Sequence, residues 1–166
     1  MVASSKKRTH PFDLEQMLTY KVSLLYSRLA LATSRQLAQG FDLVLREWRV
    51  LALLARAESM SATTLVSRSP MDKASVSRAV TNLVDRGLIS ARPDPADARV
   101  RNLALTRAGR RVFERIAPLA RERQRALLDA LTPAERKTVF RALDKLIARA
   151  NEFLDDAEPA EPSKHP

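Results

Sequence analysis

Cysteine is absent from the sequence, and histidine and glycine are scarce, with two and three residues among 166. The lack of cysteine excludes disulfide scaffolds, cysteine-ligated metal and iron–sulfur sites, thiol nucleophiles and cysteine-based redox sensing. Both histidines, His10 and His165, lie in expected terminal tails, so the body of the chain offers no histidine metal site or general base. The glycines Gly40, Gly87 and Gly109 are isolated, which excludes a glycine-rich phosphate-binding loop.

Long apolar runs are also absent. None approaches the roughly 18 residues of a membrane span, and the N-terminal segment lacks the hydrophobic core of an export signal. We therefore expect a soluble, cytoplasmic protein with no membrane partner. Paired carboxylates, Asp94 with Asp97 and Asp155 with Asp156, are the remaining enzyme-like feature. Because they lie beside arginines or in a fraying terminus, we interpret them as solvated surface and predict no catalytic residue, metal or cofactor.

The charge is strongly of one sign. Lys and Arg number 29 against 19 Asp and Glu, giving a formal net charge of +10, and most of the excess lies within residues 1–110. Such a field attracts polyanions, either nucleic acid or an anionic membrane surface. Basicity alone does not decide between a nucleic-acid-binding protein and a basic domain that binds nothing.

Apolar residues recur at helical spacing along most of the chain. This pattern predicts helices over residues 12–38, 44–58, 61–69, 72–87 and 106–131, and from 133 onward. Two short segments, LISAR and RNLAL, are typical of strands and predict a β-hairpin with a polar loop. Gly87 is expected to end the fourth helix in the left-handed conformation, Thr106 to cap the fifth, and Pro118 to kink it.

The first and last helices are predicted to be more apolar than a body of this size can cover. Thr132 and Glu135 form a capping box that opens the last helix. Its apolar residues follow at steps of four, three, four and three, close to a coiled-coil seam: Val139, Leu143, Leu146, Ala150 and Phe153. This stripe fits either core packing or packing against the same helix of a second copy.

The predicted order of helix, short helix, helix, strand, polar loop and strand is that of a winged helix-turn-helix. Its third helix would be the recognition helix, which needs small polar and cationic side chains on its outer face. Residues 72–82 supply them in Lys73, Ser75, Ser77, Arg78 and Asn82, while apolar residues hold the opposite face. An ordinary surface helix would also fit this composition.

The stretch PDPADARVRNLALT at residues 93–106 interrupts the helical pattern and is interpreted as the wing. An arginine near the tip of such a hairpin can enter the minor groove and read its width and negative potential. Arg99 is the candidate. Asp97 could hold its stem by an ion pair, which would lower the side-chain entropy lost on insertion.

The sequence here resembles the MarR family of bacterial transcription regulators, over about residues 41–115. EWRVLALLA is similar to the family's second helix, and DKASVSRAVTNLVDRGLISAR to its recognition helix and first wing strand. The wing pattern is Asp, any residue, Arg, three residues, Leu, any residue, Leu, Thr. It falls on Asp97, Arg99, Leu103, Leu105 and Thr106.

This resemblance implies a mainly α fold with a small β-hairpin wing, and a triangular homodimer whose two winged lobes straddle a pseudo-palindromic site on double-stranded DNA. The expected organisation is a basic tail at 1–11, an N-terminal dimerisation helix at 12–40, a winged helix-turn-helix at 41–108, C-terminal dimerisation helices at 109–156 and a tail at 157–166. The expected DNA-binding residues are Ser61, Thr63, Lys73, Ser75, Ser77, Arg78, Asn82, Asp97, Arg99 and Arg101.

Two positions depart from the family pattern. Ala98 stands where a second wing arginine is common, and Arg101 is a candidate to compensate. Val44 stands where the second helix usually begins with Ser or Thr, and Asp42 is a candidate cap in its place.

The resemblance also implies repression that is relieved by a small, often phenolic or anionic, effector. Tyr26, Arg46 and Trp48 are the candidate pocket residues, because such a ligand needs a flat apolar wall and a fixed positive charge; a structural role is the alternative for each. Two other functions stay open: a nonspecific architectural DNA-binding protein, and a protein-interaction module that binds no DNA.

Overall fold

A computed structural model describes residues 13–95, 97 and 99–155 of the chain. The expected tails at 1–11 and 157–166 and the departure at Ala98 lie outside the described residues, as do His10, His165 and Asp156. The chain divides into two compact units, Met1–Ala117 and Pro118–Pro166, which are described separately.

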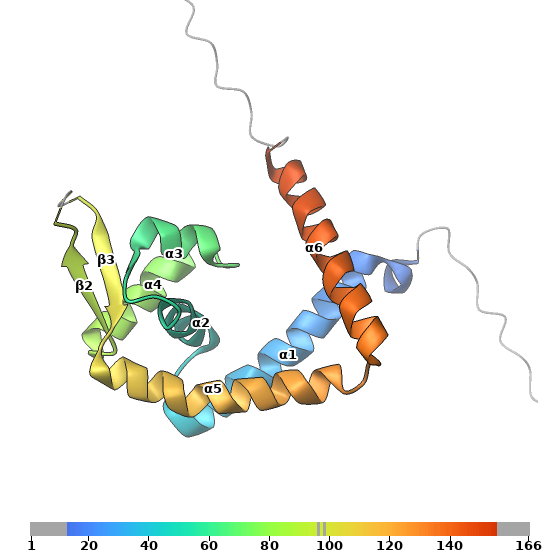
Figure 1. The fold of residues 1–166 in the computed structure, drawn as a ribbon, viewed down its shortest axis with the longest axis horizontal. Helices are drawn as coiled ribbons and strands as arrows, with labels where there is room; N and C mark the ends of the chain where they lie inside the picture. Colours follow the sequence, from blue (N-terminus) through green and yellow to red (C-terminus); the bar gives the residue numbers. More distant parts are fainter. Residues whose placement is uncertain (1–12, 96, 98, 156–166) are drawn as a thin grey trace, which may run out of the picture. The chain divides into compact units, whose positions relative to one another are not determined.

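Helices dominate the described chain, and the predicted fold class is confirmed (Figure 1). They are the 3₁₀ helix η1 (Leu14–Gln16) and the α-helices α1 (Leu18–Phe41), α2 (Leu45–Leu54), α3 (Ala62–Arg68), α4 (Lys73–Asp85), α5 (Arg107–Leu128) and α6 (Pro133–Asp155). The first helix was predicted from residue 12. It begins instead after Met17, whose extended backbone separates it from η1.

The sheet has three antiparallel strands in the order β1, β3, β2: β1 is Met60–Ser61, β2 is Ile89–Pro93 and β3 is Arg101–Leu105. The sequence predicted the hairpin of β2 and β3 but missed β1. A strand of two residues is too short for a period-two pattern to appear. Met60 lies opposite Leu103 on the central strand, and this pair ties the start of the helix-turn-helix to the wing.

The core of the first unit lies between the helices and the inner face of the sheet. Its fully buried side chains include residues from α1, α2, α3, α4 and both wing strands: Leu37, Val50, Leu51, Leu54, Leu65, Leu83, Ile89 and Leu103. The apolar face of α4 is therefore fixed on this core. Its opposite face is left free for a partner.

A tight junction joins the end of α4 to the start of α5. Gly87 has φ 63°, confirming the predicted left-handed helix end. The Thr106 hydroxyl donates to the Gly87 carbonyl at 2.7 Å and accepts from the Gly109 N–H at 3.1 Å, which confirms it as the cap. A Cβ on Gly109 would lie 1.9 Å from the Leu88 carbonyl oxygen. Only glycine allows this approach.

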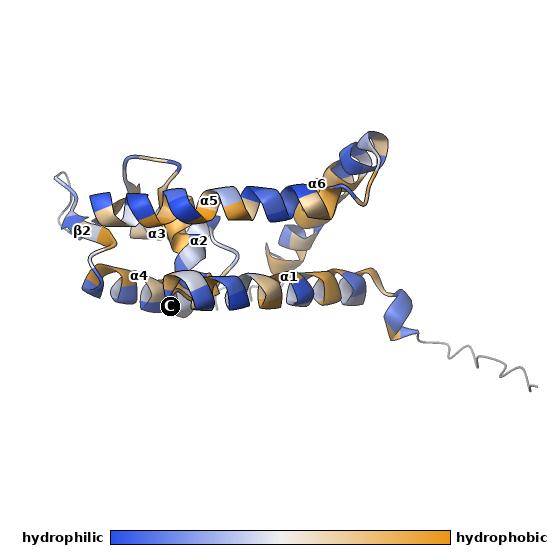
Figure 2. Ribbon diagram, turned by 90° about the horizontal axis from the view of Figure 1, so that it is seen from below, coloured by the Kyte–Doolittle hydropathy of each residue, from blue (hydrophilic) through white to orange (hydrophobic). Residues whose placement is uncertain are grey.

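Helix α1 carries many apolar side chains that its own unit leaves exposed. Figure 2 shows hydrophobic bands recurring along its length. The large exposed ones are Leu18, Val22, Leu24, Leu25, Tyr26 and Leu31. These side chains of α1 are therefore left uncovered by the described residues of its own unit.

The second unit contains the end of α5 and α6. The predicted capping box is confirmed, because the Thr132 N–H donates to Glu135 at 2.8 Å and the Glu135 N–H donates to the Thr132 hydroxyl at 3.4 Å. These bonds to Thr132 lower the pKa of the Glu135 carboxyl. Helix α6 exposes large apolar side chains at Val139, Phe140, Leu143, Leu146, Ile147, Phe153 and Leu154. In the part of the chain described, no helix combines the length and the apolarity needed to cross a membrane.

Candidate nucleic-acid interface

Helix α4 presents the polar face predicted for a recognition helix. Val76, Ala79 and Leu83 are buried on one side. Lys73, Ser77 and Arg78 are exposed on the other, with Ser75 half-buried at its edge. Short side chains around a single arginine permit close approach to base edges in a major groove.

The N-terminal end of α4 holds its arginine in place through a chain of hydrogen bonds. Asp72 caps the helix by accepting from the Ser75 N–H at 2.8 Å and from the Ser75 hydroxyl at 2.7 Å. The Ser75 hydroxyl in turn accepts from Arg78 Nη2 at 3.1 Å. The bonds from Ser75 lower the pKa of Asp72, and the nearby Arg78 charge adds to this effect. Ser75 and Arg78 thus lie together at the helix start.

Helix α3 lies beside α4 and shares an apolar groove of about 340 Å³ with it. Thr63, Lys73 and Ser77 line the groove, so the structure brings these three predicted residues together. Ser61 is placed differently. Its hydroxyl caps α3, accepting from the Thr64 N–H at 3.0 Å and donating to the Thr64 hydroxyl at 2.9 Å.

The wing turn is organised by two aspartates. Asp97 accepts from the backbone N–H of Arg99 at 2.9 Å. The predicted ion pair between Asp97 and the Arg99 side chain is not formed: within the described part of the wing, the Asp97 carboxylate accepts from the Arg99 backbone, and Arg99 is exposed. An Asp side chain readily accepts from the backbone N–H two residues on, as in an Asx turn.

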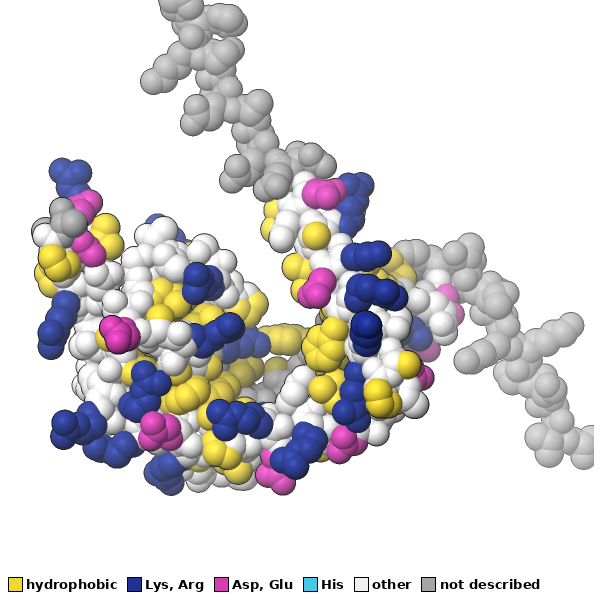
Figure 3. Space-filling view, in the orientation of Figure 1, with side chains coloured by type: hydrophobic (Ala, Val, Ile, Leu, Met, Phe, Trp, Pro, Cys, Tyr) yellow, Lys and Arg dark blue, Asp and Glu magenta, His cyan; other side chains and the backbone are white. Residues whose placement is uncertain are grey.

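Asp94 is the second organiser, a role that its interpretation as solvated surface did not predict. Its Oδ2 accepts from Asn102 Nδ2 at 2.6 Å across the hairpin, and its N–H donates to the Val100 carbonyl at 2.8 Å. The Asp94-Pro95 dipeptide is a turn-initiating signal that could have identified it. Arg99 and Arg101 are both exposed on this hairpin. Figure 3 shows Lys and Arg side chains at the wing and along α5.

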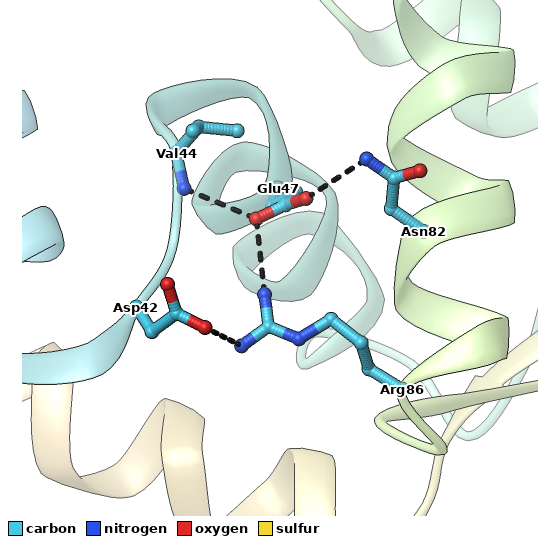
Figure 4. A network of polar contacts seen from close by, with 5 residues as sticks. All are labelled: Asp42, Val44, Glu47, Asn82 and Arg86. Atoms are coloured by element: carbon cyan, nitrogen blue, oxygen red, sulfur yellow. Dashed lines mark hydrogen bonds and ion pairs between the residues drawn. The ribbon is translucent and has the colours of Figure 1, made fainter.

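Asn82 was expected to face DNA, but its amide is engaged elsewhere. Its Nδ2 donates to Glu47 Oε1 at 3.3 Å (Figure 4). Glu47 is a buried carboxylate of α2 that also accepts from the Val44 N–H at 3.0 Å. Glu47 therefore supplies the helix cap that Val44 lacks. The suggestion that Asp42 caps α2 is wrong, because Asp42 ends α1 in a left-handed conformation.

The three candidate effector residues do not form one cluster. Tyr26 is exposed on α1, and its hydroxyl accepts from Arg49 Nη2 at 3.0 Å with the guanidinium carbon 5.4 Å from the ring centre. Arg49 thus takes the place expected for Arg46, which is exposed. Trp48 stacks on Phe113 of α5 with ring centres 5.8 Å apart. Arg46 and Arg49 are about one helical turn apart, so the sequence alone does not decide which of them lies beside Tyr26.

Comparison with known sequences gives matches to transcription regulators. A profile described as MarR family matches residues 41–100. The HTH-type transcriptional regulator PetP of Rhodobacter capsulatus is 30% identical over 114 residues, covering 66% of this chain and 69% of PetP. The HTH-type transcriptional repressor NicR of Pseudomonas putida is 26% identical over 137 residues, covering 82% and 86%.

Solved structures match over most of the chain. A MarR/EmrR family transcriptional regulator from Acinetobacter sp. ADP1 has a TM-score of 0.79 at 28% identity, covering 85% of this chain and 99% of that one. BpsR of Bordetella bronchiseptica has a TM-score of 0.73 at 26% identity, covering 82% and 97%. That BpsR structure concerns regulation of DNA binding by 6-hydroxynicotinic acid.

Proposed function

The chain belongs to the MarR family of DNA-binding transcription regulators, a family without enzymatic activity, and from this premise we propose that it is a ligand-responsive repressor that binds a pseudo-palindromic operator as a homodimer. Acting on chromosomal DNA, it works in the cytoplasm.

The observation that carries the DNA-reading part is the ordered N-terminal end of α4. Arg78 is exposed, cationic and held by Ser75, so it loses less side-chain entropy when it meets a base edge than a free arginine would. The adjacent Thr63, Lys73 and Ser77 supply phosphate and base contacts from the same surface. On the wing, the exposed Arg99 enters the flanking minor groove, and Arg101 contacts the backbone.

The homodimer is supported by the uncovered apolar faces of α1 and α6. Exposed side chains such as Leu25 on α1, and Phe140 and Ile147 on α6, lie on helices of 24 and 23 residues. A soluble monomer rarely leaves faces of this size uncovered. We assign dimerisation to residues 12–40 and 109–156 and DNA binding to 41–108. A two-fold dimer would then place its two recognition helices in half-sites about one helical turn apart.

Effector binding is supported by Tyr26 and Arg49. An exposed ring and a guanidinium held 3.0 Å from its hydroxyl offer the flat wall and positive charge that a small anionic aromatic molecule needs. NicR is a repressor and BpsR responds to 6-hydroxynicotinic acid, which favours repression relieved by such a molecule. Release requires that the ligand favour a lobe spacing that does not fit two half-sites. Trp48, stacked on Phe113, and the exposed Arg46 lie outside the Tyr26–Arg49 pair, so this proposal assigns them no contact with the ligand.

The test is selection of duplexes from fragments of the source genome with the purified protein, followed by titration of the preferred duplex and a scrambled duplex. A repressor of this kind prefers its selected site by about a thousandfold or more. Equal affinity for both duplexes would favour a nonspecific architectural protein, which the net charge of +10 also supports. No binding at low salt would leave a protein-interaction module.

A further inference from the structure

Arg86 connects the end of the recognition helix to two carboxylates on other elements. It is the residue that follows Asp85, the last residue of α4. Its Nη1 lies 3.4 Å from Glu47 Oε2 on α2, and its Nη2 lies 3.4 Å from Asp42 Oδ2 at the end of α1 (Figure 4). The two terminal nitrogens of the Arg86 guanidinium thus connect the end of α4 to α2 and to the end of α1.

Of the two contacts that Arg86 makes, the one with Glu47 is the stronger. Glu47 is 4% exposed and receives hydrogen bonds from Val44, Asn82 and Arg86. A carboxylate buried to this extent is stable only when donors satisfy it. Two of these three donors come from α4 and its cap. Moving the C-terminal end of α4 away from α2 would therefore leave this buried carboxylate with the Val44 N–H as the one remaining donor of the three.

The contact with Asp42 is the weaker one, because the Asp42 side chain is fully exposed and solvent screens the pair. Its geometry is nonetheless specific. Asp42 has φ 50° and ψ 45°, a left-handed conformation that few residues other than glycine adopt. This conformation turns the chain between α1 and α2 and brings the carboxylate to Arg86. Arg86 thus links the C-terminal end of α4 to the turn between α1 and α2.

We propose that Arg86 is a positioning residue for DNA recognition, which sets the angle of α4 so that Arg78 reaches base edges. The proposal rests on the DNA-reading function proposed above. Arg86 follows Arg78 by eight residues, or about 12 Å along a helix. A tilt of roughly 10° about the anchored end would move Arg78 by about 2 Å, which is more than the distance range of a hydrogen bond allows.

Specific and nonspecific binding respond differently to such a tilt. Contacts with base edges need fixed geometry, whereas phosphate contacts made by long flexible side chains tolerate displacement. Loss of the Arg86 bridge should therefore lower affinity for the preferred duplex and spare affinity for scrambled DNA. A role in stability alone would not change this ratio at temperatures well below unfolding.

Arg86→Lys is the sharpest variant, because it keeps the charge and removes the planar fork that spans two carboxylates. Arg111→Lys, at an exposed position of α5, is the matched control. Fluorescence anisotropy with the selected duplex and a scrambled duplex of equal composition measures the ratio of affinities. We expect about a tenfold fall in this ratio for Arg86→Lys, the size of one lost base contact, and no change for Arg111→Lys.

Glu47→Gln provides a second variant, since its amide oxygen still accepts from the Val44 N–H while the charge that attracts Arg86 is gone. Combined with Arg86→Lys it should lower the ratio no further than either change alone. Hydrogen exchange of the free protein should be faster at the C-terminal end of α4 in both variants.

An unchanged ratio in Arg86→Lys, with a clear preference in the wild type, would overturn the positioning role and leave the proposed function intact. Equal losses on both duplexes, together with a lower melting temperature, would also overturn it, because Arg86 would then only stabilise the fold. Absence of any preferred duplex for the wild type would instead refute the proposed function, and the positioning role with it.

Discussion

Arg78 donates to the hydroxyl of Ser75 across one turn of α4, at 3.1 Å, and the same hydroxyl donates to Asp72 at 2.7 Å. The Arg78 side chain is therefore held in one orientation in the free protein. The anion that orients it also caps the helix, so local folding and preparation of the binding surface depend on the same three side chains.

Replacing Arg78 by alanine should weaken binding to the preferred duplex by about 1–3 kcal/mol, because one base-edge contact is lost. Affinity for scrambled DNA should change much less. Gel shift or anisotropy on both duplexes checks this, with far-UV circular dichroism confirming the fold. Ser75→Ala should give a smaller loss in the same direction, since the arginine remains but is no longer held. An equal loss on both duplexes would reassign Arg78 to a phosphate.

Replacing Arg99 by alanine should weaken binding most on duplexes with A·T-rich flanks, whose narrow minor groove attracts an inserted arginine. Duplexes that share the central half-sites and differ only in flanking composition provide the measurement. Asp94→Ala should have a related but weaker effect, because the wing turn loses its bond to Asn102 while Arg99 stays. A loss independent of flanking sequence would argue against insertion in the groove.

Replacing Gly109 by alanine should destabilise the first unit by about 3 kcal/mol or more, the upper end of the overpacking range. The added Cβ would lie 1.9 Å from the Leu88 carbonyl oxygen, and the backbone would have to move. Gly40→Ala is the matched control, because nothing lies within 4 Å of its Cβ. That control should be neutral or slightly stabilising in a helix. Urea unfolding of both variants measures the free energy of unfolding, and the comparison separates the cost of the clash at Gly109 from the gain in helix propensity on replacing glycine by alanine.

Introducing charge on the apolar face of α6 should dissociate the dimer. The double change of Leu143 and Ile147 to glutamate places two charges among exposed apolar residues that we assign to the interface. Sedimentation velocity should then show a monomer with weakened operator binding. Lys145→Glu, also exposed on α6, is the control and should leave the dimer intact. A dimer that survives the double change would place the interface elsewhere.

Asp72 should contribute stability that depends on pH in a defined direction. Hydrogen bonds from Ser75 lower its pKa below the usual 3.8, so its contribution is complete above that pH and is lost as the pH falls through the lowered value. Asp72→Asn keeps a capping side chain and removes this titration. The advantage of the wild type over this variant should shrink on acidification below pH 3.8. NMR titration of the carboxyl should show the lowered pKa directly.

Sequence patterns predicted those parts of the fold that repeat or that carry a local signal. Leu103 illustrates the first case, because its place in an alternating run indicated a buried strand residue and it is 1% exposed. Gly87 and Thr106 illustrate the second, since a helix end and a cap are determined by their immediate neighbours. β1 was missed because its two residues form a strand only through pairing with a distant segment.

The candidate interface was predicted in its residue types but not in its internal contacts. That Lys73, Ser77 and Arg78 share an exposed face follows from helical spacing. That Asn82 turns towards Glu47 does not, because the two residues are 35 positions apart and meet only through packing of α2 on α4. The same holds for Arg49 and Tyr26, 23 positions apart. Side chains that bond across elements are determined by tertiary packing, which a single sequence does not display.

The junction at Thr106 has no spare residues in the connection between β3 and α5. A single residue separates β3 from α5, and its side chain bonds the turn that ends α4. An inserted residue here would disrupt the contacts that Thr106 makes with the end of α4, and with them the junction of β3, α4 and α5. The turn between α5 and α6 has no comparable bond to a distant element among the described contacts, and its residues 129, 130 and 132 are exposed. Families of such proteins should therefore vary in length at that turn and stay constant at Thr106.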